Sequence, residues 1–173
     1  MNLALPTKTK LLLSKNNISK ILNYSRFVEG RNNQTWKISN KKGTWVLKIY
    51  PAIKKNYNLR LNNEYNFLKI LEEKGIREVP KAIDHDKKNN IALYSYLPGK
   101  KVKNIKISYI YQAINFIKKI NKYKNIKKFK QFPNASDSCL SINNHILCVQ
   151  KRFDQIKKLK ASSPLKAKTA RFF

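Results

Sequence analysis

Short alternations of apolar and polar residues dominate the first hundred positions of the chain and predict strands. Five segments have this pattern, and they span residues 25–29, 35–39, 44–50, 79–85 and 91–96. The polar residues 40–43 predict a tight turn between the second and third strands, and residues 84–90 predict another between the fourth and fifth. Such closely spaced strands favour antiparallel pairing.

Apolar residues at helical spacing predict four helices, at residues 14–24, 57–74, 108–122 and 141–159. In the second helix, Leu61, Leu68 and Leu71 form an apolar stripe, and Gly75 follows as a C-terminal cap. The order along the chain is a helix, three strands, a helix, two strands and further helices. This order predicts an α+β fold, with a five-stranded antiparallel sheet, one inserted helix and a helical segment after it.

The chain is strongly basic, with 38 Lys and Arg residues against nine Asp and Glu residues and a formal net charge of +29. A charge of this size attracts polyanions, so a basic nucleic-acid-binding protein is one open hypothesis. Specific readers of nucleic acids use Arg for bidentate contacts, whereas only six of these residues are Arg and the Lys residues are spread from end to end. The pattern favours non-specific binding of polyanions at low salt.

Other function classes find little support in the sequence. Cys139 and Cys148 lie at a spacing that predicts neither a disulfide framework nor a zinc site. No apolar run reaches the length of a membrane span. The first residues contain Pro6 and scattered Lys, which is unlike a secretory signal. We therefore expect a cytoplasmic protein without a membrane span.

Two charged residues fall where the pattern calls for apolar ones. Lys48 lies in the middle of an apolar strand, where alternation places it on one face together with Val46 and Tyr50. Glu64 lies on the apolar stripe of the helix at residues 57–74. Lys48 alone could simply face solvent, but a Lys48–Glu64 pair would satisfy both charges. Either charge left unpaired in a buried site costs on the order of 3–5 kcal/mol.

A polar turn at residues 29–35 separates the first two predicted strands. Gly30 permits backbone conformations that other residues resist, and the N–H groups of such a turn, including those of Asn32 and Asn33, can hold phosphate. With a single glycine, the turn alone predicts no more than a hairpin.

In their order and spacing, these segments resemble the opening half of small-molecule kinases of the aminoglycoside phosphotransferase and choline kinase type. The matching segments are residues 30–38, 46–50, 63–65, 79–80 and 97–99. The resemblance covers about residues 18–159 and implies a protein-kinase-like ATP-binding N-terminal lobe at residues 1–99. Residues 100–173 would be the hinge and a partial helical C-terminal lobe. The implied reaction is transfer of the γ-phosphoryl group of ATP to a hydroxyl of a small molecule.

The same resemblance implies roles for residues at the phosphates. Lys48 would hold the α- and β-phosphates, and Glu64 would orient Lys48. The turn containing Gly30, Asn32 and Asn33 would cover the phosphates.

At the other end of the nucleotide, Tyr94 and Tyr96 would contact adenine through backbone groups. ATP is thus the implied cofactor, and Mg²⁺ is expected for the complete family protein.

The catalytic residues of the family have no counterpart in this sequence. They are an Asp in a His-Gly-Asp type loop, an Asn soon after it and a later metal-binding Asp. Asp84, His85 and Asp86 superficially imitate that loop but come before the hinge, so they predict a polar turn. Asp154 is predicted on a helix. We therefore expect no catalytic or metal-binding residue in this chain.

These observations predict a truncated or fragmentary kinase that is inactive by itself. The alternatives are a basic nucleic-acid-binding protein and a pseudokinase-like binding module.

Overall fold

The computed structural model describes residues 5–27, 33–51, 59–100, 102–133 and 141–157 of the 173 residues. The chain forms two compact units, Met1–Phe132 and Pro133–Phe173, which are treated separately below. Within the described residues, each helix is too short or too polar to cross a membrane. The expected boundary at residue 99, between an N-terminal lobe and a partial C-terminal lobe, stays a prediction.

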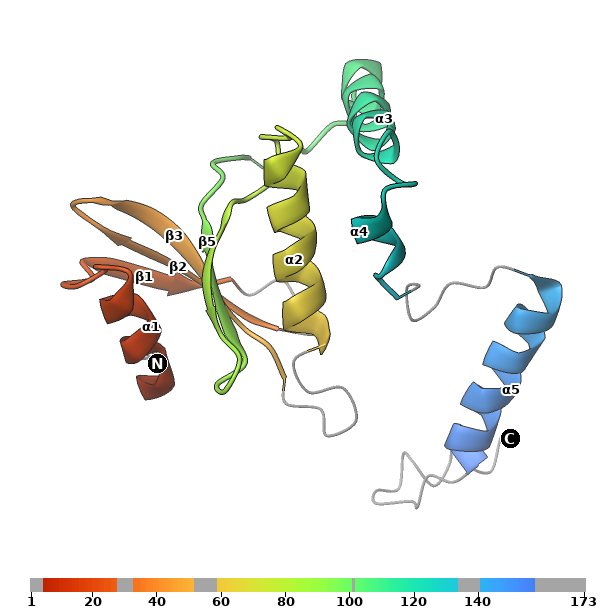
Figure 1. Ribbon diagram of the computed structural model, residues 1–173, viewed down its shortest axis with the longest axis horizontal. Helices are drawn as coiled ribbons and strands as arrows, with labels where there is room; N and C mark the ends of the chain where they lie inside the picture. The colour runs from red at the N-terminus through yellow and green to blue at the C-terminus, as the bar shows by residue number, and fades with distance from the viewer. Residues whose placement is uncertain (1–4, 28–32, 52–58, 101, 134–140, 158–173) are drawn as a thin grey trace. The chain divides into compact units, whose positions relative to one another are not determined.

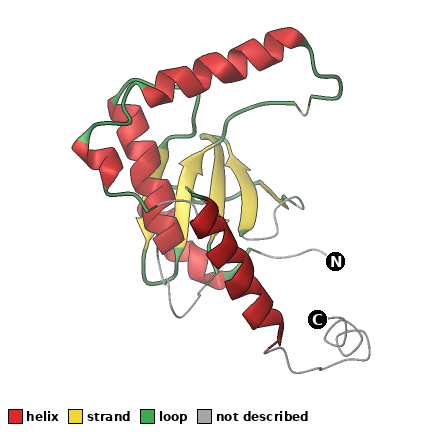
Figure 2. Cartoon of the chain, turned by 90° about the vertical axis from the view of Figure 1, so that its right-hand side faces the viewer, coloured by secondary structure: helices red, strands yellow, loops and turns green. Residues whose placement is uncertain are grey.

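Five antiparallel strands form one sheet in the first unit, in the order β1-β2-β3-β5-β4 (Figures 1 and 2). The strands are β1 (Asn23–Arg26), β2 (Gln34–Asn40), β3 (Gly43–Ile49), β4 (Ala82–Asp86) and β5 (Ile91–Ser95). All five predicted strands are present, with ends shifted by a few residues. The central strand β3 is hydrogen-bonded to neighbours on both sides, as are β2 and β5.

The tight turn between β2 and β3 forms as predicted. Asn40 faces Gly43 across a two-residue loop, and the Lys42 N–H donates to the Asn40 side-chain oxygen at 2.7 Å. The second predicted turn is shorter than expected, because β4 continues through Asp86 before the chain reverses. Asn90 closes this turn in the left-handed region, with φ 57°.

The first helix lies earlier than the sequence predicts. A 3₁₀ turn, η1 (Thr7–Thr9), leads into helix α1 (Lys10–Lys15), and the predicted helix at residues 14–24 is wrong. Asn17 and Lys20 adopt positive φ values of 57° and 50°, which no helix interior accommodates. The apolar residues after Asn17 instead turn back to the sheet, where Ile18 is buried.

Helix α1 and helix α2 (Leu59–Glu73) cover opposite faces of the sheet (Figure 1). On the α1 side, an apolar cluster contains Leu12, Leu13, Ile18, Trp36, Ile38, Leu47, Ile49, Ile91 and Leu93. On the α2 side, a second cluster contains Tyr50, Leu61, Leu68, Ala82, Ala92 and Tyr94. The predicted alternation in β3 is confirmed, since Leu47 belongs to the first cluster and Val46 packs against the second.

Helix α2 ends where the sequence predicts. Gly75 has φ +71°, a conformation that favours glycine, and its N–H donates to the Glu72 carbonyl at 2.9 Å. The next N–H, that of Ile76, reaches back to the Leu71 carbonyl at 3.0 Å, and Ile76 is buried. This cap fixes the far end of the helix that carries Glu64.

The remaining helices are α3 (Ile107–Asn121), α4 (Lys127–Lys130) and, in the second unit, α5 (Ile142–Lys157). The helices predicted at residues 108–122 and 141–159 are therefore confirmed. Helix α4 contacts α2 through aromatic rings, with Phe67 lying 5.5 Å from Phe129 and 5.8 Å from Phe132 between ring centroids. These contacts lie on a part of α2 remote from the sheet-facing Leu61.

Candidate functional site

Lys48 and Glu64 form a close ion pair between β3 and α2. The Lys48 ammonium donates to both Glu64 carboxylate oxygens, at 2.7 Å each. The side chains are 20% and 36% exposed, so the pair is shielded by protein yet reachable from solvent. The predicted pairing of Lys48 with Glu64 is confirmed. The two hydrogen bonds hold the Lys48 ammonium in one position.

This ion pair lies in the wall of a pocket of about 380 Å³. The pocket is lined by residues of β2, β3, β5 and α2 and of the segments that connect these elements. They are Phe27, Thr35, Val46, Lys48, Glu64, Leu68, Pro80, Tyr94, Ser95, Tyr96, Leu97 and Gly99. Apolar side chains and one Lys–Glu pair therefore share one concave surface. That combination suits a ligand with a flat apolar part and an anionic part.

The structure brings four of the predicted site residues together at this pocket, namely Lys48, Glu64, Tyr94 and Tyr96. Gly30 and Asn32 lie outside the described residues. Asn33 is half-buried just before β2, and its side-chain oxygen is buried without a hydrogen-bond partner. Asn33 itself does not line the pocket.

The backbone next to Tyr94 and Tyr96 is already partly engaged within the protein. The Tyr96 N–H donates to the Thr44 carbonyl at 3.4 Å. Ser95 and Lys81 bond reciprocally, since the Ser95 N–H donates to the Lys81 carbonyl at 3.0 Å and the Lys81 N–H to the Ser95 hydroxyl at 2.8 Å. The chain leaves the sheet at Leu97, which lines the pocket and begins the segment ending at Gly99.

Two tyrosine hydroxyls meet beside the ion pair. The hydroxyl oxygens of Tyr50 and Tyr94 are 2.7 Å apart, and both side chains are buried. Burial raises the pKa of Tyr50 far above its ordinary value, and Tyr94 and the Glu64 carboxylate raise it further. Burial also raises the pKa of Tyr94. Both hydroxyls therefore stay protonated at neutral pH and act as hydrogen-bonding groups.

The Asp84-His85-Asp86 segment has a structural role. Asp84 accepts hydrogen bonds from Asn16 and Lys15 at 2.9 Å each, which ties β4 to α1. Burial alone would raise the pKa of Asp84, but these bonds outweigh it and hold the pKa below its ordinary value. Burial lowers the pKa of His85, whose ring lies 4.2 Å from that of Tyr65.

The segment does not line the pocket, so its likeness to a catalytic loop is superficial. Within the described residues, no three His, Cys, Asp or Glu side chains gather in a way that could hold a metal ion.

Sequence reasoning did not assign Phe27 or Leu68 to the pocket wall, and it did not find the hydroxyl bond between Tyr50 and Tyr94. The strand face shared by Val46, Lys48 and Tyr50 was readable from alternation. The bond of Tyr50 to Tyr94 could not be predicted in this way, because it depends on β3 pairing with β5 rather than with β4.

A protein-family model matches more than half of the chain. The model of the phosphotransferase enzyme family (APH) matches residues 23–142. No curated protein sequence matches the chain at a significant level.

Among solved structures, the chain is similar to the spectinomycin phosphotransferase APH(9)-Ia in complex with ADP and spectinomycin. The TM-score is 0.59 at 16% identity, over 95% of this chain and 52% of that one. A mutant of aminoglycoside 2′-phosphotransferase-IIIa in complex with GDP gives a TM-score of 0.52 at 15% identity, over 86% of this chain and 50% of that one. The choline kinase LicA from Streptococcus pneumoniae gives 0.48 at 15% identity, over 87% and 58%.

At these identities the likeness establishes the fold, and the predicted α+β, protein-kinase-like class is confirmed. The chain spans about half the length of the first two solved structures that it matches.

Proposed function

The chain belongs to the phosphotransferase enzyme family, and we propose that its pocket binds ATP with the phosphates at Lys48. The observation that carries this proposal is the Lys48–Glu64 pair in the pocket wall, with two 2.7 Å hydrogen bonds. A Lys held by a helix carboxylate presents a fixed positive charge, which suits the α- and β-phosphate oxygens of a nucleotide. Two of the similar solved structures contain ADP or GDP.

The rest of the pocket suits the base of the nucleotide. Val46, Leu68 and Leu97 supply apolar surface for a flat aromatic ring, while the backbone around Tyr96 and Leu97 supplies polar groups at its edge. We therefore propose that Tyr94 and Tyr96 contact the adenine. We also propose that the turn containing Gly30, Asn32 and Asn33 covers the phosphates.

The parent reaction that we propose is transfer of the γ-phosphoryl group of ATP to a hydroxyl of a small molecule, which needs the complete family protein. Lys48 would stabilise phosphate charge during that transfer, and Glu64 would keep Lys48 in place. Among the described residues that line the pocket, Glu64 supplies the one carboxylate, and it is occupied by Lys48. We therefore expect these 173 residues to bind nucleotide without transferring its phosphoryl group.

The basic charge supports a weaker, separate expectation. We expect the chain to attract polyanions non-specifically at low salt. No observation in the described residues favours a specific nucleic-acid site. The cytoplasmic location also stays a prediction. Nucleotide binding must therefore be measured at physiological ionic strength, where diffuse attraction is screened.

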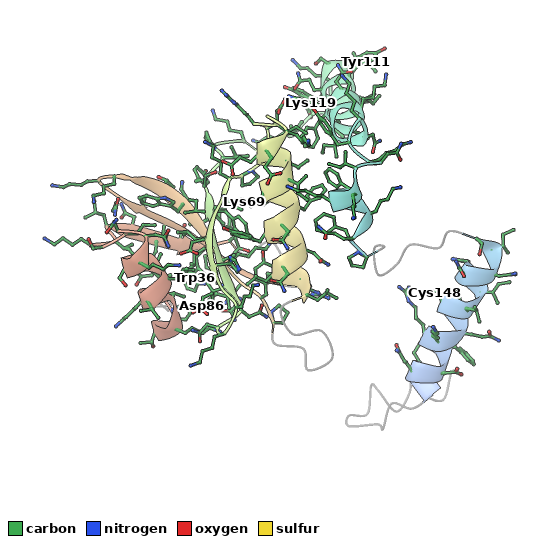
Figure 3. All side chains as sticks on the ribbon, in the orientation of Figure 1. Trp36, Lys69, Asp86, Tyr111, Lys119 and Cys148 are labelled. Carbon is green, nitrogen blue, oxygen red and sulfur yellow. The ribbon has the colours of Figure 1, made fainter. Side chains whose placement is uncertain are left out.

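The test is calorimetric titration of the chain with MgATP, comparing Lys48→Met with Lys69→Met. Lys69 lies on α2 (Figure 3) and is not among the residues that line the pocket, so its removal deletes one charge outside the site. We expect Lys48→Met to weaken binding by about tenfold or more, the effect of losing one charge-assisted contact of roughly 1.4 kcal/mol or more. Lys69→Met should change the dissociation constant by less than about twofold. Equal losses in the two variants would show that the net charge, not the pocket, attracts the nucleotide.

A further inference from the structure

Two buried tyrosines surround the position of Lys48 on the α2 face of the sheet. Tyr50 directly follows β3 and comes two residues after Lys48, so the two side chains lie on the same side of the sheet, where Tyr50 belongs to the α2-side cluster. In β5, Ala92 lies directly opposite Lys48, and Tyr94 comes two residues later. The tyrosines thus lie on either side of the Lys48–Ala92 pair along the strands. The small Ala92 side chain leaves space for their hydroxyls to meet at 2.7 Å.

Tyr50 touches the charged pair directly. The Lys48 ammonium lies 5.4 Å from the centroid of the Tyr50 ring, within the range of a cation–π contact. The Glu64 carboxylate lies close enough to act on the Tyr50 hydroxyl, since it adds to the rise in the pKa of Tyr50 that burial and Tyr94 cause. A change in the orientation of Tyr50 would therefore alter the surroundings of both charges.

Tyr94 connects the same group to the rest of the pocket. It lines the pocket with Lys48 and Glu64, and its ring packs 6.5 Å from that of Tyr65. Its hydroxyl bonds the Tyr50 hydroxyl in a site where neither side chain is more than 3% exposed. A hydrogen bond without competing water holds both rings in one arrangement.

We propose that Tyr50 and Tyr94 are positioning residues of the nucleotide site, whose hydroxyl–hydroxyl bond fixes the Tyr50 ring and thereby the Lys48–Glu64 pair. The inference rests on the proposed nucleotide binding. Because Tyr94 also lines the pocket, one side chain connects the part proposed for the base with the cation proposed for the phosphates.

The test removes single hydroxyl groups and measures how well Lys48 is held. The variants are Tyr50→Phe and Tyr94→Phe, and the matched control is Tyr65→Phe. The Tyr65 hydroxyl donates to the Ile83 carbonyl at 3.2 Å, and Tyr65 is the neighbour of Glu64 on α2. The control therefore loses a comparable hydrogen bond from the same region without breaking the tyrosine pair.

The first readout is the rate at which sulfosuccinimidyl acetate labels Lys48, measured by mass spectrometry with Lys69 as the internal reference. We expect Tyr50→Phe and Tyr94→Phe to raise the Lys48 rate by about threefold to tenfold, because an ammonium that leaves its ion pair with Glu64 more often meets the reagent more often. Lys69 should be unchanged. The second readout is the MgATP dissociation constant, which should rise by a similar factor.

The double variant Tyr50→Phe/Tyr94→Phe should show no larger effect than Tyr50→Phe, since Tyr50→Phe alone already removes the bond between the two hydroxyls. Tyr65→Phe should leave both readouts within about twofold of the unsubstituted chain. Lys48 labelling that is equal in Tyr50→Phe, Tyr94→Phe and Tyr65→Phe would overturn the inference.

The two proposals fail in different ways. If the unsubstituted chain does not bind MgATP, the proposed nucleotide binding is wrong, while Lys48 labelling still decides whether the tyrosine pair positions Lys48. If MgATP binds but the labelling rates do not differ, the nucleotide site stands and the positioning role is wrong.

Discussion

The two faces of the central sheet are built from the same strands but have different chemistry. The face toward α1 buries aliphatic side chains such as Leu47 and Ile38 together with Trp36. The face toward α2 buries two tyrosine hydroxyls beside a partly exposed ion pair and borders a pocket. The first face is closed by packing, whereas the second is left open where Lys48 and Glu64 meet.

This difference comes from single-residue alternation in β3. Leu47 is fully buried on one side, and Lys48, the next residue, reaches the pocket on the other. A central strand that is hydrogen-bonded on both edges cannot easily slip, because a shift of one residue would exchange the two faces. The packed face therefore sets the register in which the other face presents its charge.

The largest effect is expected when the neighbouring residues Leu47 and Lys48, which lie on opposite faces, are substituted one at a time. Leu47→Ala removes a fully buried side chain and should lower the free energy of unfolding by about 2–5 kcal/mol. Urea denaturation followed by circular dichroism measures the loss. Lys48→Met should cost much less stability while weakening MgATP binding, since its side chain is partly exposed.

A stability loss in Lys48→Met as large as that in Leu47→Ala would contradict this division. It would mean that the ion pair, rather than the aliphatic cluster, holds the strand in place.

Much of this contrast could be predicted from the sequence, because alternation depends only on neighbouring residues. The assignment of Leu47 and Lys48 to opposite faces needed no knowledge of the fold. The Lys48–Glu64 pair followed from two charges at apolar positions that could satisfy one another. The Gly75 cap was equally local.

What the sequence could not predict depends on local backbone exceptions or on distant pairing. The apolar spacing around Ile18 imitates a helix, but Asn17 and Lys20 adopt left-handed conformations that end α1 early. The Tyr50–Tyr94 bond requires β5 to lie beside β3, which is set by the whole sheet. The remaining wall of the pocket, including Phe27 and Leu68, has the same origin.

A smaller effect is expected from the polar link that holds α1 to the packed face. Asp84→Ala removes the acceptor for Asn16 and Lys15 and should cost about 1–2 kcal/mol at neutral pH. The pKa of Asp84 is lowered in the folded state, so its stabilising effect is present above its ordinary pKa near 3.8 and is lost as the pH falls through the folded value. The difference between the variant and the unsubstituted chain should therefore shrink in acid, as urea denaturation at several pH values would show.

MgATP binding by folded Asp84→Ala should be unchanged at neutral pH, since Asp84 does not line the pocket. A loss of binding comparable to that in Lys48→Met would mean that the two faces are not independent.

The smallest expected effect is an alkaline one on the pocket face. The pKa of Tyr50 is raised far above its ordinary value of 10.0, chiefly by burial, so the folded chain keeps a proton that the unfolded chain releases above that pH. Stability from this group is complete below pH 10 and declines as the pH rises further, by about 1 kcal/mol half a unit to one unit above 10. Tyr50→Phe has no proton to release and should show a shallower decline between pH 9.5 and 11.

Tyr111→Phe on α3 is the control, because that side chain is 61% exposed and its loss removes one tyrosine without touching the sheet. Comparing slopes rather than absolute stabilities cancels the titration of the many Lys residues, which all three chains share. Identical slopes in Tyr50→Phe and the unsubstituted chain would mean that the Tyr50 hydroxyl is reached by water or hydroxide in the folded state. The pocket face would then be more open than the 3% exposure of Tyr50 indicates, and the contrast with the closed face would be greater still.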